Sequence, residues 1–268
     1  MLAGPKPRIF TFLSATSPAE KSAMLVNLSA SLAYAGSDVV LLDACASEHG
    51  ISQRMGVTPQ ATLLDVARQQ RALNQVVQTM PQGFRLASLT NGSLRAITHD
   101  VDQTRRLSNA FNVLASQSDL LVVDAELDEQ DNVPIPGMTS GDIVIQVSPA
   151  AASIKEAYSL IKRVNEQLGR RPFGILVTGA DEQEAQTVYK NISQTAGRYL
   201  AVQLHSIGFV PQDDHVTRAS RLGRAVIDAF PLAGASIAFR RLAERFALQS
   251  NKDNGLHGLS AGSVKLGV

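Results

Sequence analysis

The sequence predicts a three-layer α/β fold, in which a mostly parallel central sheet carries helices on both faces. Apolar stretches of strand length alternate with helical patterns along most of the chain, and this alternation is typical of such folds. Two stretches, residues 38–43 and 119–124, are almost continuously apolar, as strands are when helices cover both faces of a sheet. With 268 residues, of which 44% are hydrophobic, the chain can bury a sizeable core.

Local signals place the elements along the chain. Ala35-Gly36 ends the first helix, Asn91-Gly92 ends a strand, and Pro211 closes the last strand. The expected strands are residues 8–14, 38–43, 84–89, 119–124, 142–147, 173–177 and 204–210. The expected helices are residues 21–34, 62–70, 102–117, 151–168, 182–199 and 232–247. We expect one domain over residues 1–248 and a flexible tail over residues 249–268, which are rich in Gly, Ser and Asn.

Composition excludes several classes of function. The formal net charge of +1 gives no general signal for nucleic acid, so no such partner is expected. A single cysteine, Cys45, excludes an intramolecular disulfide and fits a reducing cytosol. No apolar run reaches the ~18 residues of a membrane span, and no signal-peptide pattern follows the first eight residues. We therefore expect a cytoplasmic protein, with peripheral contact at the inner membrane left open.

Residues 14–22 connect the first strand to the first helix, and they end in Lys21-Ser22. This is where a phosphate-binding loop of the pattern G-x-x-x-x-G-K-[ST] is found. Ala15 and Glu20 stand at the two glycine positions, so only the lysine and the hydroxyl residue remain. Because Pro18 has no N–H and Glu20 carries a carboxylate, the sequence predicts a poor cradle for phosphate.

The segment Ser17-Pro18-Ala19-Glu20 also has a second interpretation. Serine at the N-cap, proline at the first helical position and glutamate at the third form a capping box. The helix would then begin at Pro18, and the Glu20 carboxylate would occupy the positive end of its dipole. The alternative is a chance match to Ser-x-x-Glu at an ordinary helix start.

Two aspartates complete an ordered set with the lysine and the serine. Asp43 and Asp124 each end a predicted buried strand. In a P-loop nucleotidase the lysine binds phosphate, the serine hydroxyl ligates Mg²⁺, and a strand-end aspartate holds the water shell of the metal. The alternative is that each aspartate caps the following helix or turn.

These residues carry a resemblance to a known family. The chain resembles the MinD/ParA-type ATPases with a deviant Walker A loop, and within them the FlhG (FleN, YlxH) branch, which regulates flagellar number and placement. The resemblance covers about residues 8–248 and is carried by residues 12–28, 39–44, 56–66, 118–124, 158–162, 207–213, 230–231 and 241–243. It implies that Mg·ATP, if bound, contacts Lys21, Ser22, Asp43, Asp124 and Thr178, with Ser22, Asp43 and Asp124 at the metal.

The departures from the family pattern fall on every class of nucleotide contact. Thr16 stands at the signature lysine, Cys45 at an acidic residue of switch I, and Thr178 at the asparagine that reads adenine. Ala125-Glu126-Leu127 follows the Walker B aspartate, where the family has a small polar residue, Pro and Gly. The FlhG segment that stimulates the GTPase FlhF normally precedes the first strand, where only eight residues are found. With no basic residue adjacent in sequence, Cys45 is expected to be a buried small hydrophobe and not a reactive thiol.

The resemblance implies an FlhG-like regulator that acts by protein contacts, with ATP binding and hydrolysis weakened or lost. Its partners would be flagellar assembly proteins, either an FlhF-like GTPase or basal-body components, and a homodimer is allowed. The alternatives are an active ATPase switch, or a paralogue in another polar-localisation or secretion pathway such as cellulose secretion.

Two further features bear on partners. Two arginine groups could form a basic docking face for a partner or an acidic membrane, or else a solvated face: 218, 221 and 224, and 240, 241 and 245. The tail could bind a membrane through its apolar residues, although its glycines disfavour a helix.

Overall fold

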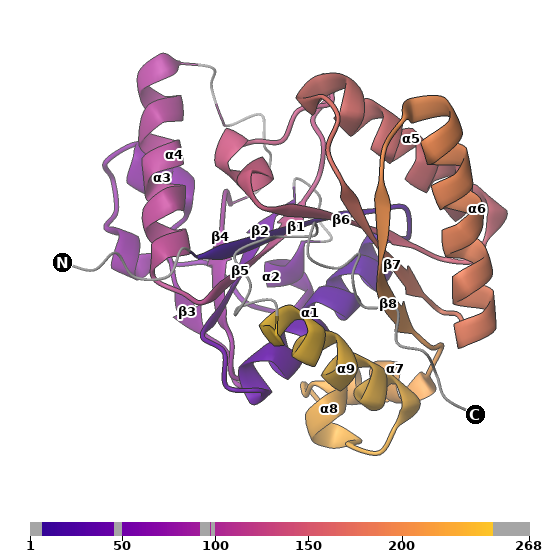
Figure 1. Ribbon diagram of the computed structural model, residues 1–268. Coiled ribbons are helices and arrows are strands. Elements are labelled where there is room, and N and C mark those ends of the chain that lie inside the picture. The colour runs from indigo at the N-terminus through magenta and orange to yellow at the C-terminus, as the bar shows by residue number, and fades with distance from the viewer. Residues whose placement is uncertain (1–6, 46–49, 92–96, 98–99, 249–268) are drawn as a thin grey trace.

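A computed structural model describes residues 7–45, 50–91, 97 and 100–248 (Figure 1). Its strands form one eight-stranded sheet in the order β3-β4-β2-β5-β1-β6-β7-β8. Every neighbouring pair is parallel except β3 and β4. The strands are β1 (Arg8–Ser14), β2 (Val39–Ala44), β3 (Gln78–Thr79), β4 (Arg85–Ser88), β5 (Leu120–Ala125), β6 (Asp142–Val147), β7 (Phe173–Thr178) and β8 (Leu204–Val210). The predicted three-layer, mostly parallel fold is confirmed.

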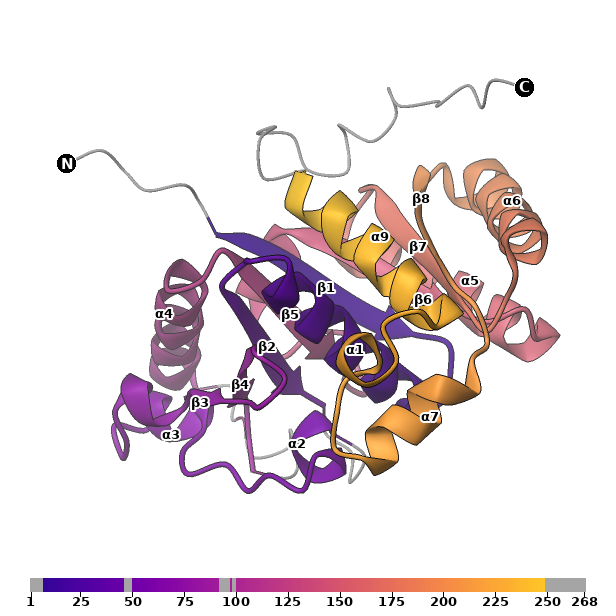
Figure 2. The same cartoon turned by 90° about the horizontal axis from the view of Figure 1, so that it is seen from below.

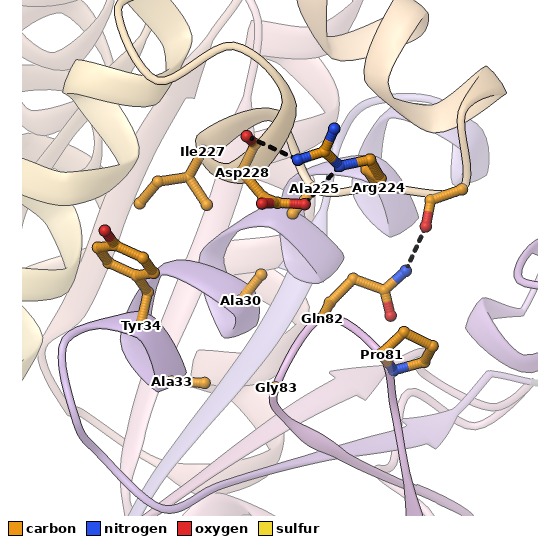
Figure 3. Close-up of a pocket in the computed structure, with 11 residues that line it drawn as sticks. Ala30, Ala33, Tyr34, Pro81, Gln82, Gly83, Arg224, Ala225, Ile227 and Asp228 are labelled. Atoms are coloured by element: carbon orange, nitrogen blue, oxygen red, sulfur yellow. Dashed lines mark hydrogen bonds and ion pairs between the residues drawn. The ribbon is translucent and has the colours of Figure 1, made fainter.

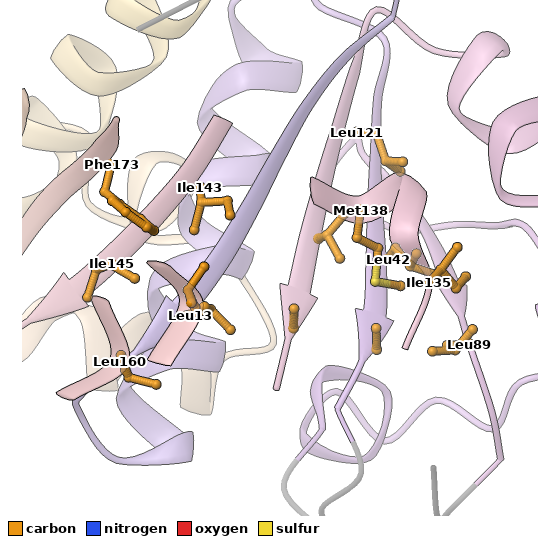
Figure 4. Packing of buried hydrophobic residues seen from close by; sticks show 14 of the residues in the cluster. Leu13, Leu42, Leu89, Leu121, Ile135, Met138, Ile143, Ile145, Leu160 and Phe173 are labelled. Atoms are coloured by element: carbon orange, nitrogen blue, oxygen red, sulfur yellow. The ribbon is translucent and has the colours of Figure 1, made fainter. Parts of the chain in front are cut away.

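Helices cover both faces of this sheet (Figures 1 and 2). One face packs against α3 (Leu63–Ala67), α4 (Val101–Ser116), α5 (Ala151–Leu168) and α6 (Glu182–Leu200). The other packs against α1 (Pro18–Tyr34), α2 (Ile51–Arg54), α7 (Asp214–Arg221), α8 (Val226–Ala229) and α9 (Gly234–Leu248). Figure 4 shows part of the first core, where Leu42 and Leu121 of neighbouring strands lie near Met138. Because both faces are covered, every residue of β2 and β5 is buried.

The core on the second face, beneath α1 and α9, brings residues from the beginning of the chain into contact with residues from its last helix. The rings of Phe10 in β1 and Phe246 in α9 meet edge to face, with centroids 4.5 Å apart, and the Arg8 guanidinium donates to the Phe246 carbonyl. Asn27 of α1 is buried, and its Oδ1 accepts a 2.7 Å hydrogen bond from the N–H of Val226, the first residue of α8. Helix α1 is therefore fastened to the last quarter of the chain by a specific polar contact as well as by apolar packing.

All seven expected strands are present. Of the six expected helices, the one over residues 151–168 has the expected bounds and the other five have shifted ends. Strand β3 and helices α2, α7 and α8 were not predicted. Helices α2 and α8 have about one turn each and α7 has eight residues, so all three are shorter than the window of about 11 residues in which helical periodicity is recognised. The expected helix over residues 62–70 ends at Ala67. The expected tail lies outside the described residues.

Within the part of the chain that the structure describes, no helix has both the length and the apolar character needed to span a bilayer.

Candidate nucleotide site

The candidate site lies at the carboxyl ends of β2, β5 and β1, which are neighbours in the sheet. The strand register pairs Asp43 with Asp124, and Phe12 with Asp124. The first helix, α1, begins four residues after β1 ends. Sheet order therefore brings Lys21, Asp43 and Asp124 to one edge, where doubly wound sheets bind ligands.

The N-terminus of α1 is closed by its own side chains. Ser17 is the N-cap, Pro18 is the first helical residue, and the Glu20 N–H donates to Ser17 Oγ over 3.3 Å. Glu20 Oε2 accepts from the Ser17 N–H at 3.0 Å and from the Ser17 hydroxyl at 2.8 Å. The predicted capping box is therefore confirmed, and both of its side chains are solvent-exposed.

Lys21 follows this box and turns into the protein. Its Nζ lies 2.5 Å from Asp124 Oδ1 and donates to the Ala125 carbonyl at 2.5 Å. The lysine side chain is 6% exposed and that of Asp124 is 0% exposed. Burial alone would lower the pKa of Lys21, but the Asp124 carboxylate, with smaller contributions from Cys45 and Glu126, raises it above its ordinary value. The pair is therefore a buried salt bridge with a protonated lysine.

Asp43 is held by backbone groups. Its Oδ2 accepts a 2.8 Å hydrogen bond from the N–H of Ser52, in the first turn of α2, and its Oδ1 accepts one of 3.4 Å from the Cys45 N–H. A Cβ atom on Gly50 would lie 2.9 Å from Asp43 Oδ2, so this carboxylate needs a glycine beside it. Burial raises the pKa of Asp43 although these hydrogen bonds lower it. Asp43 thus caps the helix that follows its strand, the structural role that the sequence left open.

Cys45 is half-buried between the other members of the cluster. Its Sγ lies 3.8 Å from Lys21 Nζ and 3.8 Å from the Asp124 carbonyl oxygen. Although no basic residue adjoins Cys45 in sequence, Lys21 reaches it from another element. Burial nevertheless raises the pKa of the Cys45 thiol, since desolvation outweighs the attraction of the ammonium group. The thiol is therefore neutral, as expected.

The remaining predicted residues point elsewhere. Thr16 Oγ1 lies 2.9 Å from Ser14 Oγ, within its own turn. The Ser22 hydroxyl donates to the Pro18 carbonyl at 2.9 Å. Thr178 Oγ1 accepts from Gln146 Nε2 at 3.1 Å, at the end of β7, which β6 and β1 separate from β5. Sequence reasoning missed Ser52 and Gln146, because the one-turn helix α2 and the buried polar end of β6 carry no motif.

Asp43, Cys45 and Asp124 lie close enough together to be candidate metal ligands. One ligand atom from each of Asp43, Cys45 and Asp124 lies within 4.8 Å of the others. Mg²⁺ requires near-octahedral oxygen ligands and does not select thiols. Here one donor is sulfur, and an ammonium group lies 2.5 Å from Asp124. As arranged, these residues do not fit Mg²⁺, and the capped start of α1 offers no free cradle of N–H groups for phosphate.

Comparison with known proteins gives a consistent set of relatives. No protein-family model matches the chain. The antiactivator FleN of Pseudomonas aeruginosa is 31% identical over 226 residues, which are 84% of this chain and 81% of FleN. The MinD cell division protein of Aquifex aeolicus superposes with a TM-score of 0.67 at 16% identity, covering 90% of this chain and 96% of that one. MinD from Pyrococcus horikoshii, solved with Mg-ADP, gives 0.66 at 18% identity, covering 91% and 99%.

Proposed function

This chain belongs to the MinD/ParA family of ATPases, and from that premise we propose that it is a FleN-like regulator of flagellar number or placement. It would act through protein contacts, with ATP binding and hydrolysis weakened or lost. Its partners would be flagellar assembly proteins, either an FlhF-like GTPase or basal-body components, and a second copy of the chain is a further partner. The proposal places it in the cytoplasm, with at most peripheral contact at the inner membrane.

The proposed loss of nucleotide binding is supported above all by the capping box at the start of α1. Glu20 Oε2 accepts two hydrogen bonds from Ser17, so an internal carboxylate stands where P-loop proteins bind an external phosphate. At ~4 Å, two like charges repel by about 1 kcal/mol in bulk water and about 4 kcal/mol at an effective dielectric of ~20. A nucleotide would have to displace this carboxylate before it could reach the α1 backbone.

The Lys21–Asp124 salt bridge adds a second obstacle. Asp124 is 0% exposed, and a buried charge that loses its partner is strongly destabilising. A phosphate that drew Lys21 away would leave the Asp124 carboxylate buried without a counter-charge, unless a metal ion took the place of the lysine. The thiol at Cys45 makes that replacement less favourable.

The second candidate function is an ATPase switch, and one observation favours it. Lys21, Ser22, Asp43 and Asp124 keep the order of a P-loop site, and Lys21 still reaches the Walker B-like aspartate. In this alternative, the nucleotide opens the capping box, and Lys21 leaves Asp124 and binds the phosphate.

Calorimetric titration with Mg·ATP separates the two candidates. We expect the natural protein to bind more weakly than low micromolar, and Pro18→Gly with Glu20→Gly to bind more tightly. Asp65→Gly is the matched control, because it opens the capping box of α3 and should leave ATP binding unchanged. A low-micromolar dissociation constant for the natural protein would exclude the proposed loss and favour the switch.

The regulatory role is tested in the organism that encodes the chain. We expect deletion of the gene to change the number or position of flagella, counted by electron microscopy. Ser22→Ala, which removes the hydroxyl that ligates Mg²⁺ in P-loop proteins, should restore the normal pattern as well as the natural gene does. A normal pattern in the deletion strain would count against the role itself, and failure of Ser22→Ala alone would favour the ATPase switch.

A further inference from the structure

A surface pocket of about 330 Å³ opens beside the end of α1 (Figure 3). Three separate parts of the chain line it: the last turns of α1, the turn between β3 and β4, and a stretch that runs from the segment after α7 into α8. Ala30 lies thirteen positions after Ser17, which is about 20 Å along a helix at ~1.5 Å per residue. The pocket is therefore distinct from the candidate nucleotide site, although the same helix forms part of both.

The inner wall of this pocket is apolar and its mouth is wide. Ala30, Ala225 and Ile227 are 2%, 2% and 5% exposed, whereas Tyr34 at the rim is 76% exposed. In Figure 3 the Tyr34 ring and the Gln82 amide lie on opposite sides of the Ala30 methyl group. The space is suited to one apolar side chain that enters between the ring and the amide.

Gln82 supplies an acceptor that has no partner within the described part of the chain. The Gln82 Nε2 donates a 2.8 Å hydrogen bond to the Gly223 carbonyl oxygen. This bond orients the amide so that its nitrogen, and not Oε1, faces Gly223. The Oε1 atom is buried without a hydrogen bond. A buried acceptor left without a hydrogen bond destabilises the fold. An N–H group from a ligand would remove that penalty.

The rim holds one arginine and one aspartate, Arg224 and Asp228, and Arg221 lies three positions before Arg224 in the sequence. Arg224 Nε lies 2.6 Å from Asp228 Oδ2, but both side chains are at least half exposed, so this pair is weak and can exchange partners. Arg221 is exposed and forms no ion pair with any residue that the structure describes. Leu222, between them in sequence, is 62% exposed. An acidic ligand would attract Arg221 and compete with Asp228 for Arg224.

Of the other four arginines that the sequence grouped into a docking face, three contact their own fold, and the fourth, Arg241, is exposed on α9. Arg218 stacks over the Phe230 ring at 5.0 Å. Arg240 donates to the Pro231 carbonyl at 2.5 Å, and Arg245 donates to the Ile207 carbonyl at 2.6 Å. Of the exposed arginines in these groups, Arg224 lines the pocket and Arg221 lies three positions before it in the sequence, whereas Arg241 lies outside the lining.

We infer that this pocket binds a short acidic segment of a partner protein. One apolar side chain of the segment enters above Ala30 and Ile227, a backbone N–H donates to Gln82 Oε1, and acidic side chains face Arg221 and Arg224. The inference rests on the proposed function in one respect, namely that the chain acts through contacts with other proteins. It does not depend on whether ATP binds.

A peptide array tests this inference with the full-length protein. The probes are eight-residue peptides that each hold one apolar residue (Leu, Ile, Val, Met or Phe) between Asp and Glu residues. The control peptides carry Ala at the apolar position or Lys at the acidic ones. We expect several acidic–apolar peptides to bind and both control sets to fail. If no acidic–apolar peptide binds above the controls, the inference is wrong.

Variants then locate the binding by fluorescence anisotropy with the best peptide. Ala33→Phe should fill the pocket, Arg221→Glu should repel the acidic residues, and each should weaken binding at least tenfold. Gln82→Leu should weaken it severalfold, and Arg170→Glu, an exposed arginine on another loop, should leave it unchanged. Thermal melting confirms that each variant folds. Equal binding by Ala33→Phe would overturn the inference.

A membrane is the competing source of acidic ligand. Vesicles of phosphatidylglycerol should not sediment the protein in a manner that depends on Arg221. If they do, and the peptides fail, the surface is a membrane contact and the inference is overturned. Failure of the peptides beside an altered flagellar pattern in the deletion strain would refute the pocket alone and leave the regulatory role standing.

Discussion

Helices α1 and α3 begin with the same motif in different surroundings. Ser17 and Glu20 form the box of α1, and Thr62 and Asp65 form that of α3, where Asp65 Oδ2 accepts from the Thr62 N–H at 2.9 Å and from its hydroxyl at 2.8 Å. The next residue is Lys21 in α1 and Val66 in α3. A capping box is thus an ordinary way to start a helix, and only its place at the carboxyl end of β1 gives the first one a functional meaning.

The two boxes also differ in their exposure to solvent. Thr62 is 3% exposed, whereas Ser17 and Glu20 lie on the surface. Water can replace a lost hydrogen bond at an exposed cap but reaches a buried one less easily. The box of α1 is therefore the weaker of the two structurally, which is the condition under which a competing ligand could open it.

The largest expected effect comes from the residue that follows the first box. Lys21→Met leaves Asp124 buried without its counter-charge, so we expect the free energy of unfolding to fall by about 3–5 kcal/mol. Urea denaturation measures it. Lys162→Met, at an exposed pair with Glu166, is the matched control and should change stability by less than about 0.5 kcal/mol. Similar values for both variants would mean that Lys21 and Asp124 do not form the buried pair.

A third helix start sharpens the comparison because its cap depends on pH. Asp213 precedes α7, and its carboxylate accepts from the backbone N–H groups of His215 and Ala235, both at 2.9 Å. Desolvation raises the pKa of Asp213, but the hydrogen bonds that the carboxylate accepts lower the pKa by more, so the net shift is downward. A lowered pKa stabilises the fold above the ordinary value of ~3.9, and this contribution disappears as pH falls through the lower folded value.

We therefore expect Asp213→Ala to lower the free energy of unfolding by about 1–2 kcal/mol at pH 7. The difference from the natural protein should shrink between about pH 4 and the folded pKa. Denaturation curves at a series of pH values measure this. A difference that stays constant down to pH 3 would show that the charge of Asp213 is not responsible.

Removal of the N-cap hydroxyl compares the first two boxes directly. We expect Thr62→Ala to lower the free energy of unfolding by about 1–2 kcal/mol and Ser17→Ala to lower it by about 1 kcal/mol. The difference arises because water can reach the cap at Ser17 but not the cap at Thr62. Chemical denaturation of both variants in one buffer gives the ranking. The reverse order would mean that α1 relies on its box more than its exposure implies.

The smallest expected effect isolates the charge of the box. Glu20→Gln keeps an acceptor for the Ser17 N–H but no longer complements the helix dipole, so we expect a loss of a few tenths of a kcal/mol. Salt should remove most of this loss, since exposed charges are screened. A loss as large as that of Ser17→Ala would show that the hydrogen bond itself, and not the charge, has been broken.

The sequence could predict what depends on local spacing. Seven of the eight strands, the Ser17 cap and the order of Lys21, Asp43 and Asp124 all follow from patterns within a few residues. The contact of Lys21 with Cys45 could not be predicted in this way, because it depends on β2 and β5 lying next to each other in the sheet. The role of Asp43 as a cap depends on α2, whose single turn has no periodic signal.

The Asn27–Val226 hydrogen bond joins groups that are 199 positions apart, and this has a consequence during synthesis. The ribosome releases β1 and α1 first, but Asn27, Phe10 and Phe12 find their partners only after α8 and α9 have emerged. Until then the part of this sheet face that α8 and α9 cover remains open, and the Asn27 amide lacks its partner. Translation that stops before residue 226 would release a chain with an exposed apolar face, the kind of species that chaperones bind and proteases remove.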